Sequence, residues 1–219
     1  MKRVGVILSG CGVFDGSEIH EAVLTLYFLD RAHAQVHCYA PDKPQRDVVD
    51  HKTQQAQQEE RNVLTEAARI ARGAIAPLSE IDLAGLDAII FPGGFGAAKN
   101  LCSFAVDGPS CDVDPDVLAT IRSAVDMGKT VGAICIAPVV VAKALEETSH
   151  RATLTIGTDE GTKSALTSMN ANPVDASAGE IAVDETNRIV TTPAYMLAQS
   201  VSEAAAGIEK LVEKVLEMS

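Results

Sequence analysis

Short apolar runs alternate along the chain with longer segments in which apolar residues recur at helical spacing. The apolar runs predict strands at residues 4–9, 35–40, 87–91, 130–134 and 152–156. Runs that are apolar at nearly every position, rather than at every second one, are typical of strands buried on both faces of a parallel sheet. We therefore expect a sheet that is covered by helices on both sides.

The segments between these runs carry the helical periodicity. In residues 19–26 the apolar side chains fall at i, i+3, i+4 and i+7, and residues 117–125 repeat an apolar side chain every fourth position. Further helices are predicted at 60–72 and 201–215. Residues 185–187 separate two short strand-like runs and predict a late hairpin. Alternating strands and helices indicate an α/β fold with a mostly parallel sheet, in one domain that spans residues 1–219.

Composition and charge then limit the partners. The chain has 219 residues, of which 47% are hydrophobic and 22% charged, with a formal net charge of -12. A surface this negative repels phosphate backbones and anionic lipids, so we expect neither nucleic acid nor a membrane as a partner. No apolar run approaches the ~18 residues of a membrane span, and Met1-Lys2-Arg3 leads straight into the first strand. We therefore expect a cytoplasmic protein.

Five cysteines are scattered through the sequence, and none belongs to a C-x-x-C pair. They are Cys11, Cys38, Cys102, Cys111 and Cys135. An odd and scattered set predicts reduced thiols, with neither a disulfide framework nor a zinc site. Cys38 falls in a predicted strand, and Cys102 and Cys111 fall in a loop region without a nearby base. Cys11 lies in the loop after the first strand and could approach Cys135 in space.

Cys135 is the strongest candidate for a reactive thiol. It lies where a predicted strand runs into a helix, and the small residues Ala133 and Ala137 stand two positions before and after it. A nucleophile held in a strained strand-to-helix turn needs small neighbours of this kind. The helix dipole also favours a thiolate at that position, so we expect an exposed and largely ionised thiol. The alternative is an inert buried cysteine.

Three other features stand in loops at the ends of predicted strands. Residues 9–18 resemble a dinucleotide fingerprint, but the third glycine comes one place late, and Asp15 and Glu18 would oppose a phosphate. Glu18 is a better candidate for a helix cap. Pro92-Gly93-Gly94 forms a tight turn whose backbone amides are free to stabilise an oxyanion, unless the glycines only turn the chain.

Glu21 lies one turn into the first predicted helix, beside apolar residues. A carboxyl in such surroundings has a raised pKa and exchanges protons near neutral pH. The alternative is a solvated Glu at a helix start, where a negative charge is favourable.

Several of these motifs together resemble a known family. They are Glu21, Pro92-Gly93-Gly94 and residues 133–138, with the longer segments 9–23, 92–101 and 191–198. The chain is similar, over nearly its whole length, to the DJ-1/PfpI branch of the class I glutamine amidotransferase-like superfamily. Within that branch it resembles the bacterial enhancing-lycopene-biosynthesis proteins, which are linked to isoprenoid biosynthesis.

The resemblance implies a flavodoxin-like three-layer sandwich, a homodimer, and a glyoxalase III-like lyase activity that needs no cofactor. The implied substrate is a small dicarbonyl such as glyoxal, which becomes glycolate. Carried onto this chain, Cys135 would form a hemithioacetal and Glu21 would move the proton between carbons. Gly93, Gly94 and Ile136 would hold the oxyanion, with Glu18 also at the substrate site.

The chain departs from the family at one point. Many relatives carry a histidine about twenty residues after the cysteine, whereas residues 153–159 contain none and His150 is the only histidine beyond Cys135. Glutamine hydrolysis is therefore disfavoured. His20 is a candidate substitute proton carrier, although a lone helical histidine is more often structural. Two alternatives stay open, namely a redox or electrophile sensor without turnover and a glutaminase-type subunit that awaits a synthase partner.

Overall fold

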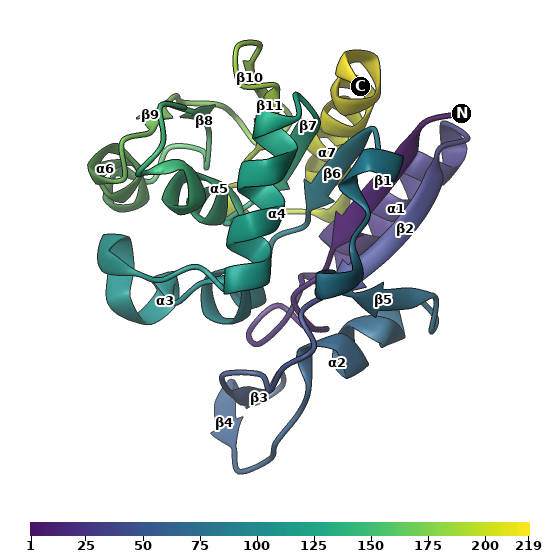
Figure 1. Ribbon diagram of the computed structural model, residues 1–219. Helices are drawn as coiled ribbons and strands as arrows, with labels where there is room; N and C mark the ends of the chain where they lie inside the picture. The colour runs from purple at the N-terminus through teal and green to yellow at the C-terminus, as the bar shows by residue number, and fades with distance from the viewer.

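A seven-stranded sheet runs through the computed structural model, which describes residues 1–219 (Figure 1). In spatial order its strands are β10 (Ala182–Asp184), β11 (Ile189–Thr192), β7 (Thr130–Ile134), β6 (Ala88–Phe91), β1 (Arg3–Ile7), β2 (Gln35–Ala40) and β5 (Ile75–Pro77). Every neighbouring pair is parallel except β10 with β11, which forms the expected hairpin. The predicted flavodoxin-like α/β sandwich is confirmed.

Helices cover both faces of this sheet. On one face lie α1 (Ile19–Arg31), α2 (Val63–Ile70) and α7 (Val201–Met218), and on the other lie α4 (Pro115–Asp126), α5 (Pro138–Leu145) and α6 (Glu160–Ser168). The short helix α3 (Phe104–Asp107) stands at the edge of the second group (Figure 1). Other short turns of 3-10 or π type cover Leu78–Glu80, Leu83–Gly85, Ala97–Leu101, Gly108–Ser110 and Ala194–Met196. None of the helices combines the length and apolar character needed to cross a bilayer.

The strands are apolar at successive positions because each face of the sheet has its own core. Ile89 and Phe91 belong to a cluster of 29 buried residues beneath α4 and α5, whereas Ile90 between them belongs to a cluster of 22 beneath α1 and α7. Successive side chains of a strand point to opposite faces, so both parities must be apolar. This is the physical basis of the continuous apolar runs.

One predicted strand lies outside the main sheet. Within residues 152–156, only β8 (Thr153–Leu154) forms a strand, and it pairs with β9 (Asn172–Pro173) in a separate two-stranded sheet. The place beside β7 is taken by β11. The apolar residues of this run serve packing instead, because Ala152, Leu154 and Ile156 are all buried in the larger core cluster.

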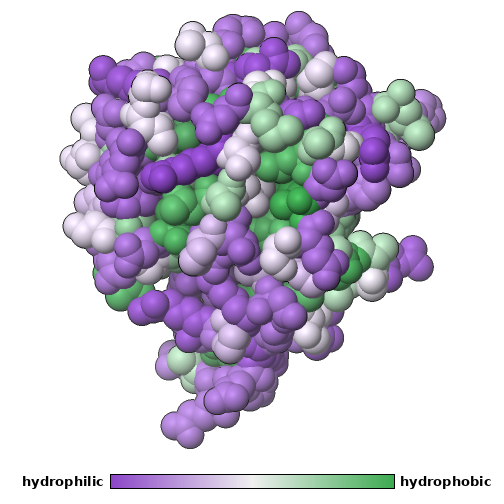
Figure 2. Space-filling view, in the orientation of Figure 1, coloured by the Kyte–Doolittle hydropathy of each residue, from purple (hydrophilic) through white to green (hydrophobic).

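A second hairpin and two surface elements were not expected. The strands β3 (Val48–Asp50) and β4 (Gln55–Gln57) pair with each other and project from the body, where Figure 2 shows a hydrophilic surface. Residues 55–57 are all exposed, so no buried face marks this hairpin in the sequence. The edge strand β5 and helix α6 bury little apolar surface, and α6 buries only Leu166. They therefore lack the periodicity that reveals buried elements.

Helix α1 presents apolar side chains to solvent as well as to the core. Ile19, Val23 and Tyr27 are 43%, 48% and 53% exposed, and they recur every fourth residue along one side of the helix. Such a stripe is compatible with the homodimer expected from the sequence, which stays a prediction.

Candidate functional site

The carboxyl ends of four adjacent parallel strands bring the candidate residues together. Strands β11, β7, β6 and β1 are neighbours in the sheet. Cys135 follows β7, Gly93 follows β6, Tyr195 follows β11, and Glu21 lies in α1 after the loop that leaves β1. The chain leaves β1 toward β2 on one side and later returns to β6 on the other, which makes this edge the switch point where open α/β sheets bind ligands.

Cys135 sits in the strained turn that its neighbours predicted. Its φ is 61°, a left-handed conformation that is uncommon for a residue with a side chain. Its amide N donates to Thr192 O at 2.9 Å, and Ala133 and Ala137 are completely buried on either side. Ala194, also completely buried, has a φ of 41°. Strain at two buried positions of one sheet edge is typical of a functional site.

Glu21 is completely buried and contacts the Cys135 thiol. Its carboxyl accepts hydrogen bonds from Gly93 N at 3.0 Å and from Tyr195 N at 3.2 Å, and it shares a hydrogen bond with the Cys135 side chain. Burial raises the pKa of Glu21 to about 8, and the nearby charge of Glu18 adds to the rise. The alternative of a solvated glutamate is therefore wrong, and the expected proton exchange near neutral pH agrees with this pKa.

The Cys135 thiol differs from the exposed and ionised group that we expected. The residue is 8% exposed, and burial, together with the charge of Glu21, raises the pKa of its thiol well above the ordinary value. The backbone amides of Gly94 and Ile136 donate toward the sulfur and act in the opposite direction. The helix dipole does not offset the effect of burial beside a second acid, which disfavours the thiolate. The negative charge of Glu21 thus disfavours a thiolate at Cys135.

Gly93 and Gly94 are required by the close approach of the backbone. A Cβ on Gly93 would lie 2.5 Å from Glu21 Oε2 and 2.9 Å from Ile134 O, so no larger residue fits between the acid and the strand. Gly94 has a φ of 96°, and a Cβ there would lie 2.5 Å from Gly16 O. The two amides have different targets, because Gly93 N donates to Glu21 and Gly94 N donates toward Cys135.

Glu18 caps α1, as expected, and also borders the site. Its Oε2 accepts from Glu21 N at 2.7 Å, which fixes the start of the helix that carries Glu21. His20 is largely exposed. Its Nδ1 lies 2.9 Å from Tyr195 Oη and 3.9 Å from Glu18 Oε1. His20 therefore reaches the site through the hydroxyl of Tyr195 and faces the carboxylate of Glu18.

A cavity of about 490 Å³ opens onto Cys135. Its wall combines apolar and aromatic side chains with two carboxyls, and it includes Val13, Glu18, Phe95, Phe104, Ile136, Asp159, Tyr195 and Met196. We call this cavity the Cys135 pocket. The sulfur is thus shielded by protein on most sides but open toward a space that a small molecule can fill.

The remaining cysteines and His150 lie outside the Cys135 pocket. All five cysteines are free thiols. Cys11 lies near Glu66 and Arg69 rather than against Cys135, and Cys102 and Cys111 contact each other. His150 bonds to Asn187 Oδ1 at 2.9 Å and faces Asp126 at 3.4 Å. The structure therefore places no histidine next to the thiol.

Two residues of the site were not singled out from the sequence. Tyr195 contributes its amide to Glu21 and its hydroxyl to His20, and Asp159 lines the Cys135 pocket from the N-cap of α6. The segment after the last strand, Pro193-Ala194-Tyr195, stands at a strand's carboxyl end and offered a positional signal for Tyr195. Asp159 had a capping signal, since Thr162 follows three residues later.

Comparison with known proteins identifies relatives that are similar over nearly the whole of this chain. The human "Glutamine amidotransferase-like class 1 domain-containing protein 3, mitochondrial" is 45% identical over 227 residues, covering 99% of this chain and 83% of that protein. The rat "ES1 protein homolog, mitochondrial" is 44% identical and covers 99% of this chain and 84% of that protein.

Among solved structures, the "isoprenoid biosynthesis protein with amidotransferase-like domain" from Ehrlichia chaffeensis superimposes with a TM-score of 0.91. It is 35% identical and covers 98% of this chain and 99% of that chain.

The expected cytoplasmic location is wrong by this comparison. The human and rat relatives are both named as mitochondrial proteins, which points away from a plain cytoplasmic location. Mitochondrial targeting segments are amphipathic and Arg-rich rather than apolar, so the lack of a long apolar run does not indicate a cytoplasmic location.

The family assignment rests on most of the sequence. The model of the DJ-1/PfpI family matches residues 11–203, a range that contains Glu21, the Gly93 turn, Cys135 and Tyr195. These residues are the ones that meet at the carboxyl edge of the sheet. The chain belongs to the DJ-1/PfpI family.

Proposed function

We propose that this protein is a cofactor-independent enzyme of the glyoxalase III type, which converts glyoxal to glycolate through a covalent adduct on Cys135. One observation carries the proposal: a completely buried carboxyl, Glu21, is hydrogen-bonded to a thiol on strained backbone at the floor of the Cys135 pocket. Burying an acid beside a thiol costs free energy, so such pairs are typical of reactive sites.

In the proposed reaction the Cys135 sulfur adds to one aldehyde carbon of glyoxal, and the carbonyl oxygen takes up the thiol proton. The product is a hemithioacetal. Glu21 then removes the proton from this carbon and returns it to the neighbouring carbonyl carbon, while the hydroxyl proton of the adduct passes to the neighbouring oxygen, which gives a thioester of glycolate. The first carbon is oxidised and the second is reduced by the same amount, so no external electron carrier is needed. Water then cleaves the thioester, which releases glycolate and restores the thiol.

The pKa of Glu21 suits this role. A carboxylate whose pKa is about 8 is a stronger base than an ordinary glutamate and still returns its proton readily near neutral pH. Because Glu21 removes a proton only in its ionised form, the proposed rate rises as the pH increases through about 8. The amides of Gly93 and Tyr195 hold the carboxyl in place during both proton transfers.

The oxyanion of the adduct forms next to the sulfur. The backbone amides of Gly94 and Ile136 already donate toward Cys135, so they are the groups in reach of a negative oxygen on the attached carbon. Gly93 acts on Glu21 rather than on the oxyanion. For the final hydrolysis, His20 is the proposed proton carrier, acting through the Tyr195 hydroxyl that lines the pocket.

The lining of the Cys135 pocket argues against the glutaminase alternative, and a measurement of turnover decides between an enzyme and a sensor. A glutaminase must bind the α-carboxylate of glutamine, yet the lining of the Cys135 pocket contains no Lys, Arg or His.

The test is glycolate formation from glyoxal by the purified protein. We expect activity in the wild type and only the uncatalysed background in Cys135→Ala. The matched control is Cys38→Ala, which removes a buried thiol from β2, well away from the pocket lining, and should retain the wild-type rate.

Equal loss in both variants would point to damaged folding instead of a lost nucleophile. Wild-type protein that forms no glycolate above background would overturn the proposal. If glutaminase activity appeared instead, the second alternative would replace it.

A further inference from the structure

The volume of the Cys135 pocket is large for glyoxal. The cavity measures about 490 Å³, within the range of about 300–1,000 Å³ that encloses drug-sized ligands. Glyoxal has only four non-hydrogen atoms, so most of the cavity would stay filled with water while it reacts. A reaction through a carbanion-like intermediate benefits from the exclusion of water. A larger substrate would exclude that water itself.

The chemistry of the lining is apolar around a polar floor. Phe104, Ile136, Met196 and Tyr195 line the cavity together with Phe95, which keeps 48% of its surface exposed. Phe104 also packs against the larger core cluster, which holds its ring in place. Flat aromatic groups pack well against such walls by stacked or edge-to-face contact.

The charged side chains of the lining are all acidic. Glu18 and Asp159 supply its only ionisable groups besides Cys135 and Tyr195. The Thr162 amide and hydroxyl hold the pKa of Asp159 below its ordinary value, so this group stays ionised. Lys99 lies 5.8 Å from the Phe95 ring, but its ammonium binds Asp47 and Phe14 O and does not line the pocket. An anionic substrate would meet repulsion without a partner.

The volume, lining and charge of the Cys135 pocket indicate a substrate larger than glyoxal, an inference that rests on the proposed function. We propose that the preferred substrate is an uncharged α-oxoaldehyde that carries an apolar group of about the size of a phenyl ring, which lies against Phe104 and Met196. Phenylglyoxal is the simplest probe of this class. Cys135 adds to its aldehyde carbon, Glu21 moves the proton from that carbon to the ketone carbon, and water releases mandelate. As with glyoxal, one carbon is oxidised and its neighbour reduced.

The first measurement compares kcat/KM for phenylglyoxal, glyoxal and 4-carboxyphenylglyoxal, with product quantified by chromatography and the Cys135→Ala background subtracted. We expect phenylglyoxal to exceed glyoxal at least about tenfold, since each well-packed apolar group adds to binding. The carboxylated probe should fall at least about tenfold below phenylglyoxal at low salt. Added salt should narrow that second ratio, because it screens the repulsion by Glu18 and Asp159.

The product also reports how the ring is held. Glycolate has no stereocentre, but mandelate does, and a fixed Glu21 reaches only one face of an intermediate whose ring is fixed. We therefore expect one mandelate enantiomer in clear excess. Racemic mandelate at the enzymatic rate would contradict a ring held against Phe104.

Two substitutions test whether the phenyl group of the substrate binds against Phe104. Phe104→Ala removes the wall and Ala105→Trp fills the space in front of it from an exposed position. Both should lower the ratio of phenylglyoxal to glyoxal activity about tenfold. Because the ratio is taken within one preparation, it does not depend on how much of a variant is folded. The matched control is Phe14→Ala, which removes a phenyl ring that packs on His51 outside the pocket and should leave the ratio unchanged.

The outcomes separate this inference from the proposed function. Turnover of glyoxal without a preference for phenylglyoxal, or with a ratio that Phe104→Ala does not change, overturns the substrate class and leaves the proposed function standing. If none of the three aldehydes is converted, the proposed function fails and this inference fails with it.

Discussion

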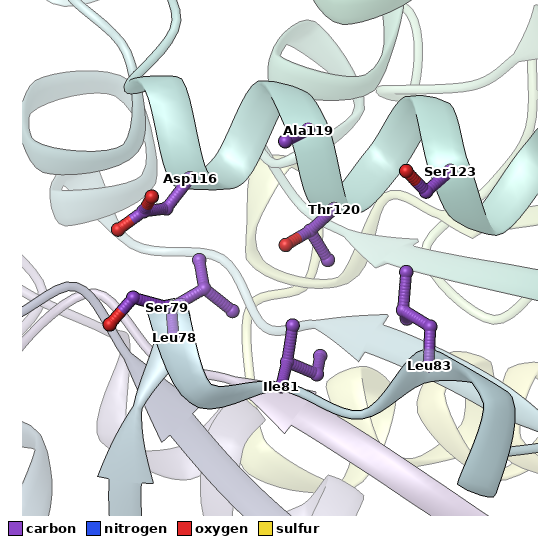
Figure 3. Close-up of a pocket in the computed structure, with 8 residues that line it drawn as sticks. All are labelled: Leu78, Ser79, Ile81, Leu83, Asp116, Ala119, Thr120 and Ser123. Carbon is purple, nitrogen blue, oxygen red and sulfur yellow. The ribbon is translucent and has the colours of Figure 1, made fainter.

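Two cavities of the molecule, the Cys135 pocket and a smaller one beside α4, differ in what they can do. The second cavity, which we call the α4 cleft, measures about 210 Å³ and lies between α4 and the segment Leu78–Leu83 (Figure 3). Figure 3 shows side chains of the two segments facing one another, with Thr120 and Ser123 on α4 opposite Ile81 and Leu83.

The difference lies in how far polar groups are removed from water. In the α4 cleft the only carboxyl is Asp116, which is exposed, and no cysteine or histidine is present. In the Cys135 pocket a carboxyl and a thiol are buried against each other and joined by a hydrogen bond. A cavity with hydroxyls and apolar walls is therefore not enough for reactivity. The buried, mutually perturbed pair is what distinguishes the first cavity.

The largest expected effect is the dependence of stability on pH that Glu21 creates. Its pKa is about 8 in the folded protein, against 4.5 for an ordinary glutamate. Between these values the folded protein holds one more proton than the unfolded chain, so the free energy of unfolding falls as the pH rises. At about 1.4 kcal/mol per unit of pKa, the contribution lost by pH 8 to 9 is about 5 kcal/mol.

Denaturant unfolding of wild type and Glu21→Gln at pH 5 and pH 8.5 measures this contribution. We expect the stability difference between the two proteins to shift in favour of Glu21→Gln at the higher pH. Asp116→Asn in the α4 cleft is the control, and its stability relative to wild type should change little between the two pH values. If the free energies of unfolding of wild type and Glu21→Gln changed equally between the two pH values, the pKa of Glu21 would not be raised in the folded protein.

The second effect is catalytic. Glu21→Gln keeps the size of the side chain but removes the base, so glycolate formation should fall about 10²- to 10⁴-fold. Asp116→Asn makes the same chemical change in the α4 cleft and should leave kcat/KM unaltered. A Glu21→Gln variant with more than a tenth of wild-type activity would exclude Glu21 as the group that moves the proton.

The third effect concerns the backbone beside the pair. Gly93→Ala would place a methyl group 2.5 Å from Glu21 Oε2, so we expect a loss of about 1–3 kcal/mol of stability together with the loss of activity. Gly179→Ala is the matched control, because its methyl would meet Ala206 Cβ at an ordinary 3.7 Å. Thermal unfolding and glycolate assays of both variants decide the point, and an active Gly93→Ala would show that the pair tolerates displacement.

The smallest effect is expected in the α4 cleft itself. Ser123 is exposed, so Ser123→Ala should change the free energy of unfolding by less than about 0.5 kcal/mol and leave glyoxal turnover intact. A marked loss of activity in this variant would mean that the α4 cleft communicates with the Cys135 pocket, and the contrast between the two cavities would need revision.

Features that depend on neighbouring residues were predictable from the sequence, whereas features that depend on distant residues were not. The turn at Cys135 was predictable because its requirements, a strand before it, a helix after it and small residues on both sides, all lie within a few positions. Strand β8 was assigned to the wrong sheet, since nothing within residues 152–156 reveals that β11 takes the place beside β7. The state of Glu21 stayed open between a buried and a solvated group for a similar reason, because both suit the start of a helix.

The sequence by itself determined the doubly buried strands, their alternation with helices and the strained cysteine turn, because these depend on the order of neighbouring side chains. Only the tertiary structure decided that Glu21 contacts Cys135 and that Tyr195 N donates to the Glu21 carboxyl, 174 positions earlier in the chain. The tertiary structure also decided that the pKa of the Cys135 thiol is raised. Exclusion of water depends on segments far apart in the chain packing together, and protonation follows from that exclusion.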